Sequence, residues 1–251
     1  MRNIIETKLR DIEAAEHVRI LHCVESGSRA WGFDSPDSDY DVRFVYLRQR
    51  EDYLRLEETR DVIEWQLDAV LDINGWDVQK YLRLLFKSNP TVFEWAFSPI
   101  VYRTTPEWSQ IAALLEGYCQ PKHLLYHYLS MAKHNEQAYL RGETVALKKY
   151  FYVLRPLLAG RWVAHRLTPP PIEFDKLTAA ELPAHLRETV DALIEQKRST
   201  PEIGRGAHIP ALDAFFAEEL TALDDMAKTL PGTHDRSWAK LDAAFLSLLT
   251  P

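Results

Sequence analysis

Cysteine, glycine and long apolar runs are all scarce in this chain, and each scarcity excludes a class of protein. Two cysteines among 251 residues, Cys23 and Cys119, cannot build a disulfide framework, which is typical of a reducing compartment. Nine glycines are too few for a collagen-like repeat. No segment reaches the ~20 apolar residues of a membrane span, and the charged N-terminus has no apolar stretch of signal-peptide length. We therefore expect a cytoplasmic protein with no membrane partner.

Positive charge is not in excess either. The chain carries 30 Lys and Arg residues against 37 Asp and Glu residues, a formal net charge of −7. A protein that coats nucleic acid or anionic lipid without specificity needs a summed positive field, so that class is disfavoured, although a local basic patch is allowed. What the chain does have is 46% hydrophobic residues, over a length that suits one large domain or two smaller ones.

Helical and extended patterns alternate over the first hundred residues. The spacing predicts a helix over 3–16, a strand over 18–24 that stops at a turn of small residues, a loop over 33–38 and a strand over 39–47. Residues 61–73 alternate as two strands or one bent strand, and a helix follows from Gly75 to a stop at Asn89-Pro90. From about residue 104 the pattern is mostly helical. We therefore predict an α/β (α+β) fold with two domains, 1–104 and 105–251, the second of them α-helical.

The stretch from Gly27 to Asp41 combines a turn that suits phosphate with a pair of carboxylates. At Gly27 and Ser28 a bare backbone and a small hydroxyl can approach phosphate oxygens, as can the N–H groups of a following helix. Asp39 and Asp41 stand two apart on a predicted strand, so both carboxylates emerge on one face, roughly 7 Å apart along the backbone. Such a pair repels itself unless a cation lies between. Hard oxygens suit Mg²⁺ or Mn²⁺, and two such ions ~4 Å apart favour phosphoryl or nucleotidyl chemistry.

The order Gly-Ser, a further Gly, then Ser-Asp-x-Asp resembles the core motif of the nucleotidyltransferases of the DNA polymerase beta-like superfamily. Other segments are similar to one branch, the predicted bacterial nucleotidyltransferases associated with RNA-repair ligases (RlaP-like). Those segments are Glu25–Phe33, Asp72–Asp77, Lys87–Pro90 and Lys148–Pro156. The resemblance implies a mixed β-sheet with flanking helices, followed by a helical accessory domain. It also implies transfer of a nucleoside monophosphate from an NTP to an acceptor hydroxyl, with release of pyrophosphate.

The resemblance also assigns roles to single residues. The residues that would hold the triphosphate are Gly27, Ser28, Arg29, Lys148 and Lys149, and those that would ligate two Mg²⁺ or Mn²⁺ ions are Asp39, Asp41 and Asp72. For Arg29 the alternative is a surface charge paired with an aspartate, and for the two lysines it is a solvated helix face.

The third carboxylate of the family acts as metal ligand and general base. Asp72 is our candidate because it ends the alternating stretch just before the predicted helix. Asp68 is the competing candidate, and Asp77 is interpreted as a helix-start carboxylate. An exposed residue on a sheet edge is the alternative reading of Asp72.

The acceptor, the preferred NTP and the oligomeric state are not readable from the sequence. An RNA end is the first candidate acceptor, followed by a protein or a small molecule. The competing function classes are a catalytically silent nucleotide- or RNA-binding module, an antitoxin-type interaction protein and a metal-dependent phosphohydrolase. His123, His127 and His134 share one predicted helix face, but the HExxH pattern of a zinc site is missing there.

Overall fold

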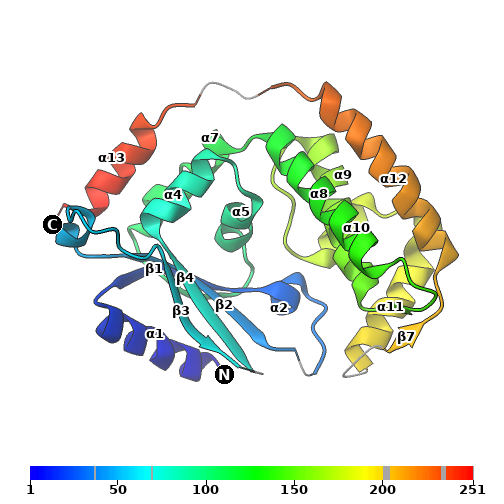
Figure 1. Ribbon diagram of the computed structural model, residues 1–251, viewed down its shortest axis with the longest axis horizontal. Coiled ribbons are helices and arrows are strands. Elements are labelled where there is room, and N and C mark those ends of the chain that lie inside the picture. The colour runs from blue at the N-terminus through cyan, green and yellow to red at the C-terminus, as the bar shows by residue number, and fades with distance from the viewer. Residues whose placement is uncertain (37, 69, 200–203, 233–235, 251) are drawn as a thin grey trace. The chain divides into compact units, whose positions relative to one another are not determined.

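The computed structural model describes residues 1–36, 38–68, 70–199, 204–232 and 236–250, and it divides them into two compact units (Figure 1). The first unit comprises residues 1–30, 39–118 and 236–250, and the second comprises 31–38 and 119–232. Positions 37 and 69, which fall in the predicted loop and in the predicted alternating stretch, lie outside the described residues.

These units differ from the two predicted domains. Residues 105–118 and 236–250 pack with the first unit, whereas residues 31–38 pack with the second. The loop before the acidic strand and the C-terminal segment each pack with the unit that is distant in sequence. As a domain boundary, residue 104 stays a prediction.

A five-stranded mixed sheet forms the centre of the first unit. Its order is β3-β4-β2-β1-β5, with β2 and β4 parallel and the other neighbours antiparallel. The strands are β1 (Arg19–Ser26), β2 (Tyr40–Leu47), β3 (Val62–Leu67), β4 (Leu71–Asp77) and β5 (Val101–Thr104). The predicted mixed α/β architecture is confirmed, and the alternating stretch forms two strands.

Helices cover both faces of this sheet. The helices of the unit are α1 (Arg2–Glu16), α2 (Gly27–Trp31, which ends in the second unit), α3 (Arg50–Tyr53), α4 (Val78–Phe86), α5 (Pro90–Ala96), α6 (Trp108–Ala112), α7 (Leu115–Tyr118) and α13 (Ala239–Leu248). Helix α1 lies along one face, where Ile5, Leu9 and Ile12 pack with Val42 and Phe44 in one buried cluster. Helices α4 and α5 lie on the opposite face, and α13 lies beside α4 (Figure 1).

The predicted helix start at Gly75 is wrong. Strand β4 continues through Gly75, and α4 begins at Val78. A Cβ at position 75 would lie 2.2 Å from the ring of Phe44, so glycine is needed here for close packing between two strands. Asp77 caps α4 by accepting a hydrogen bond from the Gln79 N–H, as its interpretation as a helix-start carboxylate predicted.

The second unit is almost entirely helical, which confirms the pattern seen after residue 104. Its elements are α8 (Pro121–Tyr139), β6 (Val145–Ala146), α9 (Lys149–Arg166), α10 (Phe174–Glu181), a 3₁₀ helix (Ala184–Leu186), α11 (Arg187–Ser199), β7 (Arg205–Gly206) and α12 (Pro210–Thr229). Helices α8, α9 and α12 pack closely around Gly160, where a Cβ would lie 3.2 Å from Leu223 and 3.4 Å from Leu125. None of the helices in the described residues has the length and apolar character needed to cross a membrane.

Candidate active site

Two of the three predicted carboxylates lie on neighbouring parallel strands. Asp41 on β2 and Asp72 on β4 are directly paired in the strand register, so their side chains emerge side by side on one face of the sheet. Asp39 immediately precedes β2, and it is near enough to Asp41 for its charge to raise the pKa of that carboxyl group. The competing Asp68 instead lies in the turn between β3 and β4, where its carboxylate accepts hydrogen bonds from the N–H groups of Val70 and Leu71.

A guanidinium group bridges the paired carboxylates. Nη2 of Arg43 lies 2.9 Å from Oδ1 of Asp41 and 2.6 Å from Oδ2 of Asp72, and Nη1 donates to the backbone carbonyl of Asp72 at 2.8 Å. Burial raises the pKa of Asp41 above its ordinary value, and Arg43 opposes that rise, while the charges of Asp39 and Asp72 add to it. Arg43 therefore supplies the positive charge that two adjacent carboxylates require.

The predicted phosphate turn lies directly against Asp41. Gly27 follows β1 with a φ of 61°, and a Cβ at this position would lie 1.9 Å from Oδ2 of Asp41. Ser26, the residue before it, pairs with Asp41 in the strand register. Only glycine lets the backbone approach the carboxylate this closely. Ser28 and Gly27 belong to α2, a helix of five residues.

Arg29 contacts the backbone of Asp39 and the ring of Tyr40. Its Nε donates to the backbone carbonyl of Asp39 at 3.0 Å, and its guanidinium lies 3.9 Å from the centre of the Tyr40 ring. A cation is thereby held next to the turn and the acidic strand, since the ring contact and the hydrogen bond orient the planar group together.

Glu25 is a member of the site to which the sequence reasoning gave no role. Its side chain is fully buried and accepts hydrogen bonds from the backbone N–H of Asp41 at 2.8 Å and from the hydroxyl of Tyr102. Burial raises the pKa of Glu25 to about 7, although these hydrogen bonds lower it and the charge of Asp41 raises it further. The available signal was a single acidic residue in the apolar run before Gly27. Through its hydrogen bond to the Asp41 N–H, Glu25 links β1 to β2 close to the start of the turn.

The two predicted lysines lie at the start of α9, in the second unit. Nζ of Lys149 lies 4.0 Å from the Tyr139 ring centre and 4.3 Å from that of Tyr152. Burial and, to a smaller extent, the charge of Lys148 lower the pKa of Lys149. The amine is thus partly desolvated between two aromatic faces, in a setting that makes a cation–π interaction stronger than at a fully exposed site.

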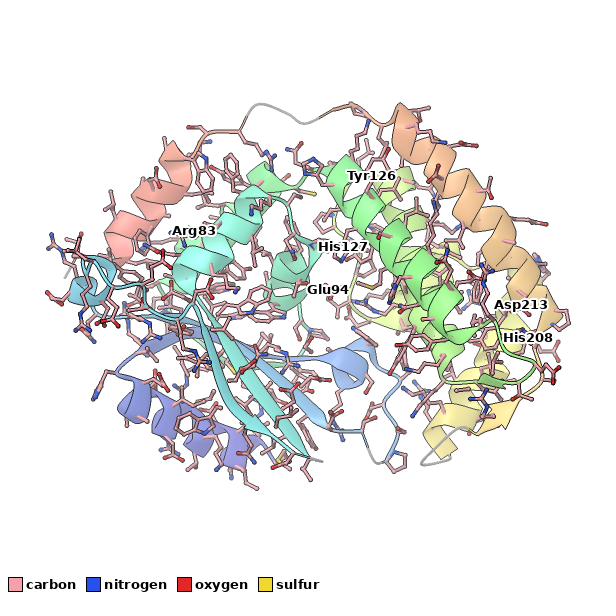
Figure 2. The ribbon with its side chains drawn as sticks, viewed as in Figure 1. Arg83, Glu94, Tyr126, His127, His208 and Asp213 are labelled. Atoms are coloured by element: carbon pink, nitrogen blue, oxygen red, sulfur yellow. The ribbon has the colours of Figure 1, made fainter. Side chains whose placement is uncertain are left out.

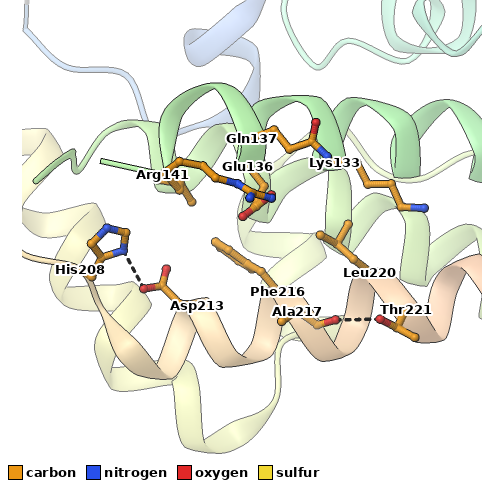
Figure 3. A pocket seen from close by; sticks show the side chains of 11 residues that line it. Lys133, Glu136, Gln137, Arg141, His208, Asp213, Phe216, Ala217, Leu220 and Thr221 are labelled. Carbon is orange, nitrogen blue, oxygen red and sulfur yellow. Dashed lines mark hydrogen bonds and ion pairs between the residues drawn. The ribbon is translucent and has the colours of Figure 1, made fainter. Parts of the chain in front are cut away.

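A groove of about 510 Å³ runs along the second unit between α8 and α12 (Figure 3). His208 and Asp213, labelled in Figure 2, lie at one end of it with Nδ1 and Oδ2 2.9 Å apart. The other imidazole nitrogen of His208 contacts the Gly142 carbonyl at 2.7 Å. Lys133 on the opposite wall is paired with Asp224 at 2.7 Å. Positive and negative groups therefore neutralise each other along this groove.

The carboxylates of the site fit the divalent cation that the motif implies. Within the described ranges, no three His, Cys, Asp or Glu side chains form a group that could hold a metal ion, the three histidines of α8 included. Mg²⁺ usually takes only one or two protein carboxylates, with the remaining ligands from substrate phosphates and water. Asp41 and Asp72 side by side, with the glycine cradle against Asp41, fit that requirement. The guanidinium of Arg43 now lies between them.

Comparison with known proteins gives one family match over almost the whole chain. The model of RlaP, the RNA repair pathway DNA polymerase beta family, matches residues 1–247. The uncharacterized protein YcgL of Bacillus subtilis is 42% identical over 252 residues, covering 98% of this chain and 96% of that protein. Among solved structures, a nucleotidyltransferase-like protein from Exiguobacterium sibiricum is 11% identical with a TM-score of 0.31, over 90% of this chain and 75% of that one.

Proposed function

The chain belongs to the RNA repair pathway DNA polymerase beta family, and from this premise we propose that it is a metal-dependent nucleotidyltransferase. The family indicates a DNA polymerase beta-like nucleotidyltransferase. The finer proposal is that a nucleoside monophosphate is transferred from an NTP to an acceptor hydroxyl, with an RNA end as the first candidate acceptor and a protein or small molecule as the others. We expect the reaction to take place in the cytoplasm.

One observation carries this proposal: the register that pairs Asp41 with Asp72, while the backbone at Gly27 lies against the Asp41 carboxylate. A turn suited to phosphate and two hard-oxygen ligands thus come within reach of one phosphate group. Asp39, one residue before β2, is the third carboxylate of the proposed site, and its charge acts on Asp41.

The proposed roles follow from these positions. Gly27, Ser28 and Arg29 bind the β- and γ-phosphates, and Asp39, Asp41 and Asp72 would hold one or two Mg²⁺ or Mn²⁺ ions. Such ions, when bound, neutralise the charge that develops on the phosphate oxygens. Lys148 and Lys149 are proposed to contribute further positive charge to the triphosphate.

Asp72 is the proposed general base. It accepts the proton of the attacking hydroxyl as the new P–O bond forms at the α-phosphate, and the bond to the β-phosphate breaks to release pyrophosphate. Oδ2 of Asp72 is held by Arg43 at 2.6 Å, which fixes the direction of the carboxylate. A base held in one orientation meets the geometric requirement for proton transfer.

Incubation with each α-³²P-labelled NTP and Mg²⁺ or Mn²⁺ tests the proposal, with cell extract divided into RNA, protein and small-molecule fractions as acceptors. The Asp41→Asn and Asp72→Asn variants remove charge without changing side-chain volume. Asp61→Asn is the matched control, because Asp61 pairs with Lys80 on the exposed surface of the same unit. With the native chain and with the control, label should enter one fraction. With either site variant, label should enter none.

A binding-only module is the second candidate, because Arg43 bridges the two carboxylates that would hold metal. That function predicts NTP binding that is unaffected by divalent cations and no label in any fraction. Release of labelled nucleotide without an acceptor would instead indicate a phosphohydrolase. Either result would overturn the proposed transfer.

A further inference from the structure

The segment that joins the phosphate turn to the acidic strand packs with the helical unit. We name the described residues of this segment, 31–36 and 38, the motif loop. Residues 27–30 before it and 39–41 after it belong to the first unit, whereas the motif loop belongs to the second. The motif loop therefore connects the two halves of the proposed site, Gly27 and Ser28 before it and Asp39 and Asp41 after it. Its own packing partners come from distant parts of the sequence.

Phe33 anchors the motif loop in the core of the second unit. Its side chain is 1% exposed, and its ring centre lies 5.0 Å from that of Phe151 on α9 and 5.1 Å from that of Phe174 on α10. Nζ of Lys197 on α11 lies 4.4 Å from the centre of the same ring. Three helices therefore contact one side chain of the loop, and a buried aromatic side chain contributes a large share of local packing energy.

Contacts to Trp31 and Gly32 hold the beginning of the loop. Nη2 of Arg198 donates to the Gly32 carbonyl at 2.8 Å, and the guanidinium of Arg155 lies 4.3 Å from the centre of the Trp31 ring. Gly32 has a φ of 82°, a conformation that favours glycine and reverses the chain after α2. The direction in which the chain leaves α2 is thus set by α9 and α11.

Helix α2 needs such support because it is very short. It spans the five residues Gly27–Trp31, and a helix of that length has too few internal hydrogen bonds to be stable in isolation. The N-terminal end of α2 follows directly on β1, which is held in the sheet by its pairing with β2. The C-terminal end of α2 runs into the motif loop, which is held by its contacts in the second unit. Ser28 lies between these two supports.

We propose that Phe33 is a positioning residue that fixes the phosphate turn, so that helices α9, α10 and α11 set the geometry of the nucleotide site through the motif loop. This inference rests on the proposed function, since it takes Ser28 and Gly27 as phosphate-binding groups. It gives the helical unit a role in the geometry of the nucleotide site.

The test compares Phe33→Ala, Phe33→Leu and Arg198→Ala with Phe216→Ala in the full chain. Phe216 is the matched control because it is equally buried in the second unit, and its ring contacts Tyr150 and Phe215. Amide hydrogen exchange over residues 26–32 and 39–42 is measured first, and kcat and KM for NTP second. The exposed Arg198 provides a variant with little risk to folding.

For Phe33→Ala we expect exchange over 26–32 to accelerate by about tenfold or more, because local opening of α2 then requires less free energy. A misplacement of about 1 Å reduces a reaction by up to ~10²-fold, so kcat/KM for NTP should fall by about 10- to 100-fold, with KM raised because the displaced turn binds the phosphates. Arg198→Ala should give a smaller change in the same direction, and Phe33→Leu should recover most of the activity. Phe216→Ala should lower the melting temperature without changing hydrogen exchange over residues 26–32 or the kinetic constants for NTP.

Equal acceleration of exchange over 26–32 in Phe33→Ala and Phe216→Ala would overturn the inference, because Phe33 would then act only as a core residue. Unchanged exchange in Phe33→Ala would overturn it as well. The exchange readout does not need catalysis. If the native chain transfers no nucleotide, the proposed function fails on its own, while the exchange experiment still decides whether Phe33 holds the turn.

Discussion

Replacing Arg43 by glutamine removes the guanidinium that contacts both Asp41 and Asp72. The native side chain is 15% exposed, and the two carboxylates are 24% and 23% exposed. A charge-assisted hydrogen bond is worth about 1.5–3 kcal/mol, and partial exposure reduces that value, so we expect a loss of about 2–4 kcal/mol for the pair. For a chain of this size that corresponds to a decrease of roughly 5–15 °C in melting temperature.

The loss should depend on pH. Arg43 lowers the pKa of Asp41, which burial raises, so the pKa rises further in Arg43→Gln. A carboxyl group whose pKa is higher in the folded than in the unfolded state costs stability as pH rises through that interval. The deficit of the variant should therefore be larger at a pH above the raised pKa of Asp41, where the carboxylate is charged, than at a pH below it.

Divalent cation should compensate for the missing guanidinium. In the variant, Oδ1 of Asp41 and Oδ2 of Asp72 lose their partner, and under the proposed function these two residues would help to hold Mg²⁺. Thermal unfolding with and without Mg²⁺ should show a larger stabilisation of Arg43→Gln than of the native chain, by the linkage between binding and folding.

Arg19→Gln is the control for this experiment. Arg19 pairs with Glu107 at 2.5 Å on the surface of the same unit, with its side chain 47% exposed, and such pairs contribute about 0–1 kcal/mol. If Arg43→Gln were no less stable than Arg19→Gln, the guanidinium would not be offsetting the repulsion of the carboxylates. If Mg²⁺ stabilised the native chain and the variant equally, the metal would bind elsewhere.

Three further predictions concern the turn, the buried glutamate and the aromatic-bound lysine. Gly27→Ala should weaken NTP binding by about tenfold or more in equilibrium titrations, because its Cβ would lie 1.9 Å from a carboxylate oxygen of Asp41. In Gly32→Ala the added Cβ meets open space, so this variant should lose only about 1 kcal/mol of stability through backbone strain. Glu25 has a pKa of about 7, above its ordinary 4.5, so stability should fall by up to about 3 kcal/mol as pH rises through that interval, and urea unfolding of Glu25→Gln should lack this dependence. Under the proposed function, Lys149→Ala should raise the KM for NTP by about tenfold with kcat little changed, since the proposed charge-assisted contact to phosphate would be lost. Lys133→Ala, at a lysine paired with Asp224, is the comparison.

Local patterns gave much of the fold. The period of two over 39–47 puts Val42, Phe44 and Tyr46 on one face, and all three are fully buried. Helical spacing puts Ile5, Leu9 and Ile12 on one stripe of a helix, and the structure packs that stripe against the sheet. Side-chain periodicity follows from backbone geometry alone, so it can be read without knowing the partner surface. The helix boundary at Gly75 was wrong because a packing requirement on a neighbouring strand overrides the local preference.

For the candidate site, too, some features follow from the sequence and others only from the tertiary structure. The sequence by itself determined that Gly27, Ser28, Asp39 and Asp41 follow a strand–turn–strand order, because these residues are close along the chain. Only the tertiary structure decided that Asp72 rather than Asp68 lies beside Asp41, and that Arg43 bridges the two carboxylates.

Glu25 and Phe33 show why the remainder needed the fold. The link from Glu25 to Tyr102 joins strands 77 residues apart, and Phe33 contacts Phe151 and Phe174 from helices more than a hundred residues away. Such pairings depend on how whole elements pack, and a single sequence carries no local signal for the partner of a given residue. The sequence therefore determined which residues could carry the chemistry, and the packing of sheet and helices decided which of them meet.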